Sequence, residues 1–374
     1  MPPTVRPIAL GAALAACALL AACTPSVSPT APADPFSDPI VPNSAIAEAP
    51  QSRANGVLGA PTPIEGRGTV KVAVLPGATL PASVESAFHD ATGFTIDQDA
   101  IDSASRIPGV GADVAFGLDA SDLLGAKDAF ASAPAIDAPA PEGTAVEGAA
   151  SEIAYGRDDV CVLADKAWMS ANRRSLPSGL DALATPELAS LLAIPDPTTS
   201  ETGALFVAAA RAKYGEGLGE WAKALKEGGA LVASGAEADS AWTALEGPQS
   251  GEAPTRPLLV APMSAIARTA TASGVEAAGV ALEGTCAKRV VYAAPAAAAR
   301  NEAGAQSLLA WLLTWQGQRA LAEAGVVHPL DETALEGTPA HWFLAPLADS
   351  TVLDEAALAQ SGEAAALWTA GLGG

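Results

Sequence analysis

The order of strand-like and helix-like segments over residues 69–117 constrains the fold more than any other feature of the sequence. Residues 69–75 have the composition of a strand, and Val84, Ala87 and Phe88 then recur at helical spacing until Gly93 ends the helix. A second strand is predicted at 94–96, and 112–117 predicts a third strand that is buried on both faces. Strand, helix and strand at this spacing predict a parallel sheet covered by helices, which is an α/β fold.

The same alternation returns later in the chain. Strands are predicted at 152–156, 160–164 and 288–293, and another strand ends at 194–197. Thr198 and Glu201 have the spacing of a capping box, which predicts a helix over 202–213. Residues 303–324 predict one long amphipathic helix.

The length and composition of the chain indicate its domain organisation and exclude some classes of binding partner. A chain of 374 residues suggests two domains or two lobes of one fold, at roughly 100–200 residues per domain. Apolar residues make up 49% but aromatic residues only 5%, so the core must consist mainly of Ala, Val and Leu. The net charge of −22 excludes a general nucleic-acid binder and disfavours an anionic membrane surface, because no basic surface is available to displace counterions.

The first 66 residues indicate export and a tether. Residues 1–22 are typical of a lipoprotein signal peptide, because Arg6 is its one charged residue and the apolar run from Ile8 to Leu20 is too short for a permanent membrane span. The quartet 20–23, Leu-Ala-Ala-Cys, resembles a lipobox and predicts lipidation of Cys23; a similar quartet ending at Cys17 and an ordinary signal peptide are the alternatives. Residues 23–66 are rich in Pro, Ser and Ala, which predicts a disordered tether at the outer face of the cell membrane or in the periplasm.

Two further cysteines, Cys161 and Cys286, fall in the predicted folded region. Outside the cytoplasm two such residues can form a disulfide, which here would join distant segments. Two buried free thiols are the alternative.

Several segments, in order, resemble the periplasmic substrate-binding proteins of ABC transporters, in particular the thiamine-binding branch. Residues 112–119 read A-D-V-A-F-G-L-D, similar to that branch's A-D-V-V-x-G-L-D, and 196–203 read D-P-T-T-S-E-T-G, similar to D-P-x-T-S-x-x-G. Looser similarities lie at 155–166, 177–183, 212–225 and 305–320. The resemblance as a whole covers roughly residues 67–335.

The resemblance implies an α/β, two-lobed periplasmic-binding-protein fold of type II, in which each lobe is a mostly parallel sheet flanked by helices. Lobe 1 is expected to comprise 67–151 and 300–374, and lobe 2 to comprise 152–299. A monomeric receptor of this kind binds a small solute between its lobes by hinge closure and delivers it to ABC permease subunits. No catalysis and no cofactor are implied.

The resemblance weakens where that branch carries aromatic rings around its ligand. The turn after the first strand is 75–78, Leu-Pro-Gly-Ala, and Ala236 stands where the branch has Trp. The segments 261–264 and 325–329 likewise lack the rings. A thiazolium cation favours ring faces, so the solute is left open between thiamine and a different small solute, which could be anionic.

Ten residues are candidate ligand contacts. Some follow strand ends or begin helices, where ligands of α/β proteins bind and where free N–H groups attract anionic oxygens. Others are predicted from their position at the hinge or in the family pattern. The candidates are Asp119, Ser121, Tyr155, Asp196, Thr198, Thr199, Ser200, Trp242, Ser264 and His328. For the strand-end and helix-start residues the alternative is helix capping; for Tyr155 and Trp242 it is packing in the core.

Enzymatic readings find little support in the sequence. His89, His328 and His341 lack metal-ligand spacing, so no metal site is predicted. Neither a G-x-S-x-G elbow nor a phosphate-binding P-loop is present. The adjacent carboxylates Asp158 and Asp159 are interpreted as a solvated turn. A lipoprotein scaffold and an exported hydrolase are the alternatives from other functional classes.

Overall fold

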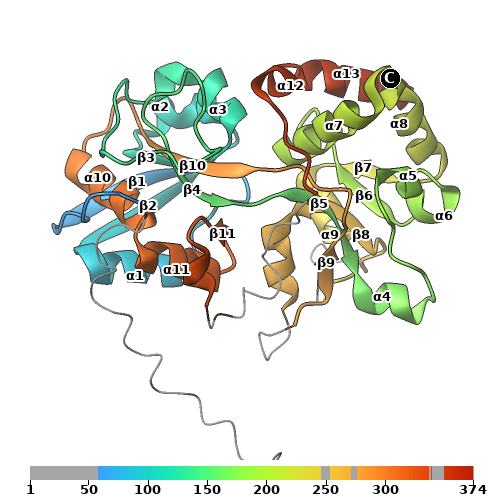
Figure 1. Cartoon of the computed structure of the whole chain (residues 1–374), viewed down its shortest axis with the longest axis horizontal. Helices are drawn as coiled ribbons and strands as arrows, with labels where there is room; N and C mark the ends of the chain where they lie inside the picture. The colour runs from blue at the N-terminus through green and yellow to red at the C-terminus, as the bar shows by residue number, and fades with distance from the viewer. Residues whose placement is uncertain (1–57, 246–252, 271–275, 337, 339–348, 374) are drawn as a thin grey trace, which may run out of the picture. The chain divides into compact units, whose positions relative to one another are not determined.

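The computed structural model of the protein describes residues 58–245, 253–270, 276–336, 338 and 349–373. All of them belong to one compact unit, which contains two sheets with their own helices (Figure 1). The predicted signal peptide, the predicted lipidation site Cys23, the alternative Cys17 and His341 lie outside the described residues. Among the helices of the described part, none is long and apolar enough to cross a membrane.

The first sheet has the strand order β11-β4-β10-β3-β1-β2 and, with its helices, forms lobe 1. Its elements are β1 (Gly68–Val74), α1 (Ala82–Thr92), β2 (Phe94–Ala100), α2 (Ile107–Val110), β3 (Val114–Leu118), α3 (Ala120–Gly125), β4 (Ile153–Arg157), β10 (Val290–Pro295), α10 (Glu302–Leu312), α11 (Trp315–Glu323) and β11 (His328–Pro329).

The second sheet has the order β7-β6-β8-β5-β9 and forms lobe 2. Its elements are β5 (Val160–Asp165), α4 (Lys166–Ala171), α5 (Leu180–Leu183), α6 (Pro186–Ala189), β6 (Leu192–Pro195), α7 (Glu201–Tyr214), α8 (Leu218–Glu227), β7 (Leu231–Ala233), α9 (Gly235–Ser240), β8 (Leu258–Pro262), β9 (Gly279–Ala281), α12 (Glu355–Ala359) and α13 (Ser361–Gly371).

Both sheets are mixed rather than mostly parallel. In lobe 1, β1 pairs in parallel with β2 and β3, whereas β10 pairs antiparallel with β3 and β4. In lobe 2, β6 is parallel to β7 and β8, but β5 pairs antiparallel with β8 and β9. The prediction of parallel sheets is correct for the strands that alternate with helices. It fails for the strands beside the crossings, where the chain enters each sheet from the other lobe.

Each sheet has a hydrophobic core on both faces, because successive side chains of a strand point to opposite faces of the sheet. In β1, Val70 and Val72 belong to the core on one face of the sheet, and Ala73 belongs to the core on the other face. In β5, Val162 and Leu163 divide in the same way between the two cores of lobe 2. β3 is buried along its whole length, as its apolar sequence predicts.

The folded part begins before the predicted end of the tether. Ala60 is 8% exposed and belongs to a lobe 1 core. The carbonyl of Ile64 accepts a hydrogen bond from Ser307 Oγ, and Gly66 N donates to Thr92 O. Residues 58–66 therefore pack on lobe 1, and the boundary predicted at residue 66 is wrong because these contacts are too distant in sequence to be read from composition.

The lobe boundaries also differ from the expected ones. β4 and β10 lie in the first sheet, although 152–299 was expected to form lobe 2. The segment after residue 349 was expected in lobe 1, but α13 packs on α7 and α8, and Trp368 is fully buried in a lobe 2 core. Figure 1 shows α12 and α13 (red) against α7 and α8, away from α10 and α11 (orange). α13 contacts both α7 and α8, and such packing between distant segments cannot be read from sequence order.

The long helix predicted over 303–324 is two helices, α10 and α11. Thr314 separates them because its hydroxyl accepts a hydrogen bond from Gly317 N at 3.0 Å and caps α11. The break at Thr314 was not predicted because the apolar pattern continues on both sides of this N-cap.

Candidate functional site

A cavity of about 560 Å³ is lined by residues of both lobes. Lobe 1 contributes Pro76, Gly77, Thr79, Pro81, Ala324, Gly325 and Val326, and lobe 2 contributes Pro195, Ser200, Thr202, Gly235, Ala236, Asp239, Leu259, Val260, Ala261, Pro262, Ser264, Ala265 and Arg268. We call this cavity the cleft. It lies at the carboxyl ends of β1, β6, β7 and β8, which is where open α/β sheets bind their ligands.

Two glycines allow the backbone to approach the cleft closely. Gly117 in β3 has φ +87°, and a side chain there would overlap Ala78 in the turn after β1. Gly203 lies in the first turn of α7, where a Cβ would overlap the carbonyl of Pro195 at the end of β6. Glycine at these positions brings the turn after β1 and the start of α7 to the cleft wall.

The start of α7 differs from the predicted capping box. Ser200, not Thr198, is the N-cap, and its hydroxyl accepts a hydrogen bond from Gly203 N. Asp196 Oδ1 accepts from Thr198 N at 2.8 Å and from Thr198 Oγ1 at 2.7 Å, so these two residues close a local turn. Thr199 is exposed beside them. Of these four candidates, Ser200 lies on the cleft wall.

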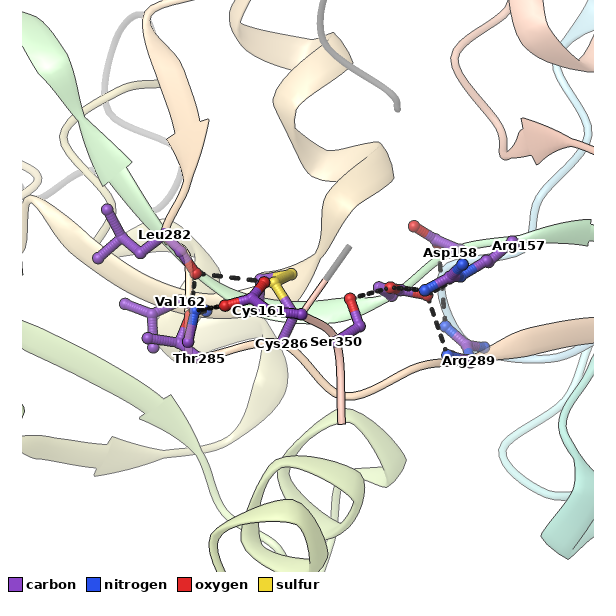
Figure 2. Close-up of a disulfide and its surroundings, with 12 residues drawn as sticks. Arg157, Asp158, Cys161, Val162, Leu282, Thr285, Cys286, Arg289 and Ser350 are labelled. Atoms are coloured by element: carbon purple, nitrogen blue, oxygen red, sulfur yellow. Dashed lines mark hydrogen bonds and ion pairs between the residues drawn. A yellow bond between two sulfur atoms is a disulfide. The ribbon is translucent and has the colours of Figure 1, made fainter. Parts of the chain in front are cut away.

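Two buried carboxylates tie the lobes together where the chain crosses between them (Figure 2). Asp158, which follows β4, accepts hydrogen bonds from Ser264 N and Oγ, both at 2.8 Å. Its Oδ2 is 3.9 Å from Nη1 of Arg289, on the returning crossing. Burial raises the pKa of Asp158, and Arg289 opposes that shift. Ser264, a predicted contact, therefore joins the cleft wall to the first crossing between the lobes.

Asp159 forms a second hydrogen-bond network at the crossing. Both its oxygens accept from Arg157, each at 2.7 Å, and Oδ2 also accepts from Ser350 Oγ at 2.6 Å. The exposed fractions of Asp158 and Asp159 are 7% and 1%. The interpretation of this pair as a solvated turn is wrong, because long-range partners bury it.

Three carboxylates meet where α3 of lobe 1 faces the start of α7. One oxygen from each of Asp119, Asp122 and Glu201 lies within 4.8 Å of the others. Asp119 caps α3, and its Oδ1 accepts from the N and Oγ of Ser121 and from Asp122 N. Burial and Asp119 raise the pKa of Asp122 to about 8, and the pKa of Glu201 is raised in the same way.

Carboxylate oxygens at this spacing can hold a hard cation such as Mg²⁺ or Ca²⁺. Asp119 is engaged as the N-cap of α3, and burial together with Asp119 raises the pKa of both Asp122 and Glu201, which lowers the negative charge of the cluster. The predicted contacts Asp119 and Ser121 are helix-capping residues in this arrangement, and Asp119 also lines the second cavity described below.

Tyr155, Trp242 and His328 do not line the cleft. Tyr155 is 1% exposed and stacks on Phe116 with ring centroids 4.3 Å apart, and burial raises its pKa. Trp242 is fully buried in a lobe 2 core, which is the alternative stated for it, and it packs there because Gly279 leaves space for its ring. His328 pairs with Arg157 across β11 and β4, and burial lowers its pKa.

A disulfide joins Cys161 in β5 to Cys286 before β10, with their Cα atoms 4.1 Å apart (Figure 2). The two crossing segments also bond through their backbones, since Val160 and Ala287 each donate to the other's carbonyl. The disulfide therefore links the two crossing segments covalently, on the lobe 2 side of the networks around Asp158 and Asp159.

A second cavity, of about 300 Å³, lies between α3, α7, the crossing at 288–290 and the segment 352–358. Thr351 N donates to Cys286 O and Lys288 N donates to Thr351 O, so this segment runs alongside the crossing. α12 then contacts both α3 and α7. The C-terminal segment is thus a third connection between the lobes.

Two groups of residues were not predicted from the sequence: the charged residues at the crossings, and the ion pair of Asp239 and Arg268 on the cleft wall. Asp158 and Asp159 directly follow β4, and Arg289 directly precedes β10, so charged residues next to strands at the crossings are the signal that could have identified them. Asp239 and Arg268 are 29 positions apart, and no local pattern relates them.

No family model and no curated protein matches the chain. Solved structures with the same fold are found. A periplasmic thiamin binding protein has 17% identity and a TM-score of 0.64, with 83% of this chain and 99% of that chain covered. AfuA from Actinobacillus pleuropneumoniae, solved with fructose-6-phosphate, has 14% identity and a TM-score of 0.62, with 82% and 99% covered. A Bordetella ferric binding protein has 20% identity and a TM-score of 0.57, with 81% and 98% covered. The chain has the two-lobed fold of periplasmic binding proteins.

Proposed function

We propose that this protein is an extracytoplasmic solute receptor of an ABC importer, acting as a monomer without catalysis. The observation that carries the proposal is the cleft, which is formed by both lobes at the carboxyl ends of their strands. Its volume of about 560 Å³ is within the range of small-molecule sites. The likeness to binding proteins for thiamin, ferric iron and a sugar phosphate supports the same role.

The proposal includes export and anchoring through lipid on Cys23, which rest on the sequence of residues 1–23. It also includes hinge closure, for which the crossings at Asp158 and Arg289 supply the connection between lobes.

Thiamine is the solute that the sequence resemblance favours. Among the described residues that line the cleft, none is Phe, Tyr or Trp, so this part of the lining offers no ring face to stack on a heterocycle or to attract a thiazolium. The lining therefore favours another small solute within the same receptor role.

Thermal unfolding with a panel of solutes tests the receptor role. The panel contains thiamine, thiamine monophosphate, a hexose phosphate, ferric citrate and the common amino acids. A solute present at one hundred times its dissociation constant should add about 2.7 kcal/mol to the free energy of unfolding. Absence of a saturable shift across the panel would contradict the receptor role and favour a lipoprotein scaffold.

A further inference from the structure

Among the described residues that line the cleft, two carry a charge: Asp239 in α9 and Arg268. Arg268 donates from Nη1 to Asp239 Oδ2 at 2.7 Å and from Nη2 to Oδ1 at 2.5 Å. The side chains are 47% and 34% exposed, for Arg268 and Asp239 respectively. The cleft wall therefore presents one guanidinium and one carboxylate side by side, with no excess of either sign.

We propose that the cleft binds a small aliphatic zwitterion of the α-amino acid class, with its carboxylate on Arg268 and its ammonium on Asp239. This inference rests on the proposed receptor function and specifies its solute. A guanidinium recognises a carboxylate through two parallel N–H donors, and a carboxylate accepts N–H bonds from an ammonium. A zwitterion replaces the internal pair by two intermolecular pairs and leaves no charge unmatched.

Exchange of partners is favourable here because an exposed ion pair contributes little to the stability of the free protein. A ligand with one charge would release one member of the pair and bury it without a counter-charge when the lobes close. The chemistry of the pair therefore disfavours simple carboxylic acids, simple amines and phosphate esters.

The rest of the lining specifies the solute further. A quaternary ammonium group is recognised mainly by aromatic faces, and the lining residues that the structure describes supply none, which disfavours betaines. An ammonium with N–H donors needs acceptors instead, and Asp239 supplies two carboxylate oxygens. Pro76, Val326 and Ala265 provide apolar surface, and Ser200 and Thr202 provide hydroxyl groups, which suits aliphatic or hydroxylated side chains.

Isothermal titration calorimetry on the full chain tests the inference with four probes: L-alanine, propionate, ethylamine and glycine betaine. L-alanine or another small amino acid from the panel should bind, and the three analogues should bind at least tenfold more weakly. Arg268→Ala and Asp239→Asn should each weaken binding of that amino acid at least tenfold. The conservative Arg268→Lys variant guards against loss of folding and should retain part of the affinity.

A matched control comes from the exposed pair Lys213–Asp181, with Nζ and Oδ2 2.7 Å apart and away from the cleft. Lys213→Ala should leave the affinity unchanged. If the protein binds a solute with a single charge, or if Arg268→Ala and Asp239→Asn leave the affinity unchanged, the zwitterion inference is wrong and the receptor role stands. If no solute of the panel binds the unmodified protein, the receptor role itself fails.

Discussion

Removing the disulfide between Cys161 and Cys286 should destabilise lobe 2 far more than lobe 1. The two cysteines are 125 positions apart, and the loop between them contains β6 to β9 and α4 to α9. Closing a loop of this length lowers the entropy of the unfolded chain by an amount equivalent to about 5 kcal/mol. Measured values for native disulfides are roughly 2–5 kcal/mol, which is the loss expected here.

Urea denaturation followed by circular dichroism measures the loss in Cys161→Ala, Cys286→Ala and the double variant. Either single substitution breaks the bridge, so each should cost nearly as much as the double variant, which is a strongly non-additive cycle. Amide hydrogen exchange should accelerate in β6 and β8 and change little in β1 and β3. A loss below about 1 kcal/mol, or additive single losses, would refute the reasoning from loop entropy.

Three other changes test separate parts of the structure. Trp368→Ala should lower the free energy of unfolding, measured by urea denaturation, by about 3–5 kcal/mol because the indole is fully buried in a lobe 2 core. The control Val352→Ala, at a side chain that is 70% exposed, should change the free energy of unfolding little. The pKa of Asp122 is raised to about 8, so the folded state holds a proton that the unfolded carboxyl releases near its ordinary pKa of 3.8. The resulting stabilisation of the folded state is complete below about pH 4 and is lost as the pH rises through 8. Asp122→Asn should therefore flatten the pH dependence of the melting temperature. An unchanged pH profile in that variant would contradict the assignment of the proton. Cys23→Ala should move the protein from the membrane fraction to the soluble fraction, and continued membrane association would refute lipidation at that residue.

Local patterns in the sequence predicted the elements but not the contacts between them. The apolar run of β3 and the Gly93 stop of α1 identified strand and helix directly, because burial on both faces and a left-handed C-cap each require particular residue types. The mixed pairing of the sheets depends on strands that return from the other lobe, and no neighbouring residues encode that. The position of Trp368 on α7 and α8 is set by packing across more than a hundred residues.

The candidate site was predictable to a similar extent. Ser200 and Ser264 lie on the cleft wall where strand ends and the family pattern placed them. The burial of Trp242 in a core could not be read from the sequence, because a buried indole and an exposed one can have the same neighbouring residues. Asp158 and Asp159 resembled a surface turn because their partners Ser264 and Ser350 are far away in the sequence.

The central claim is that a small solute binds in the cleft between the lobes, and a matched pair of substitutions tests it most directly. Ala236 is exposed on the cleft wall in α9, and Ala171 is exposed at the end of α4 away from the cleft lining. Calorimetric titration should show that Ala236→Trp weakens the solute identified in the thermal panel at least tenfold, while Ala171→Trp leaves its affinity unchanged. Equal affinities in the two variants and in the unmodified protein would place the solute outside the cleft and contradict the account.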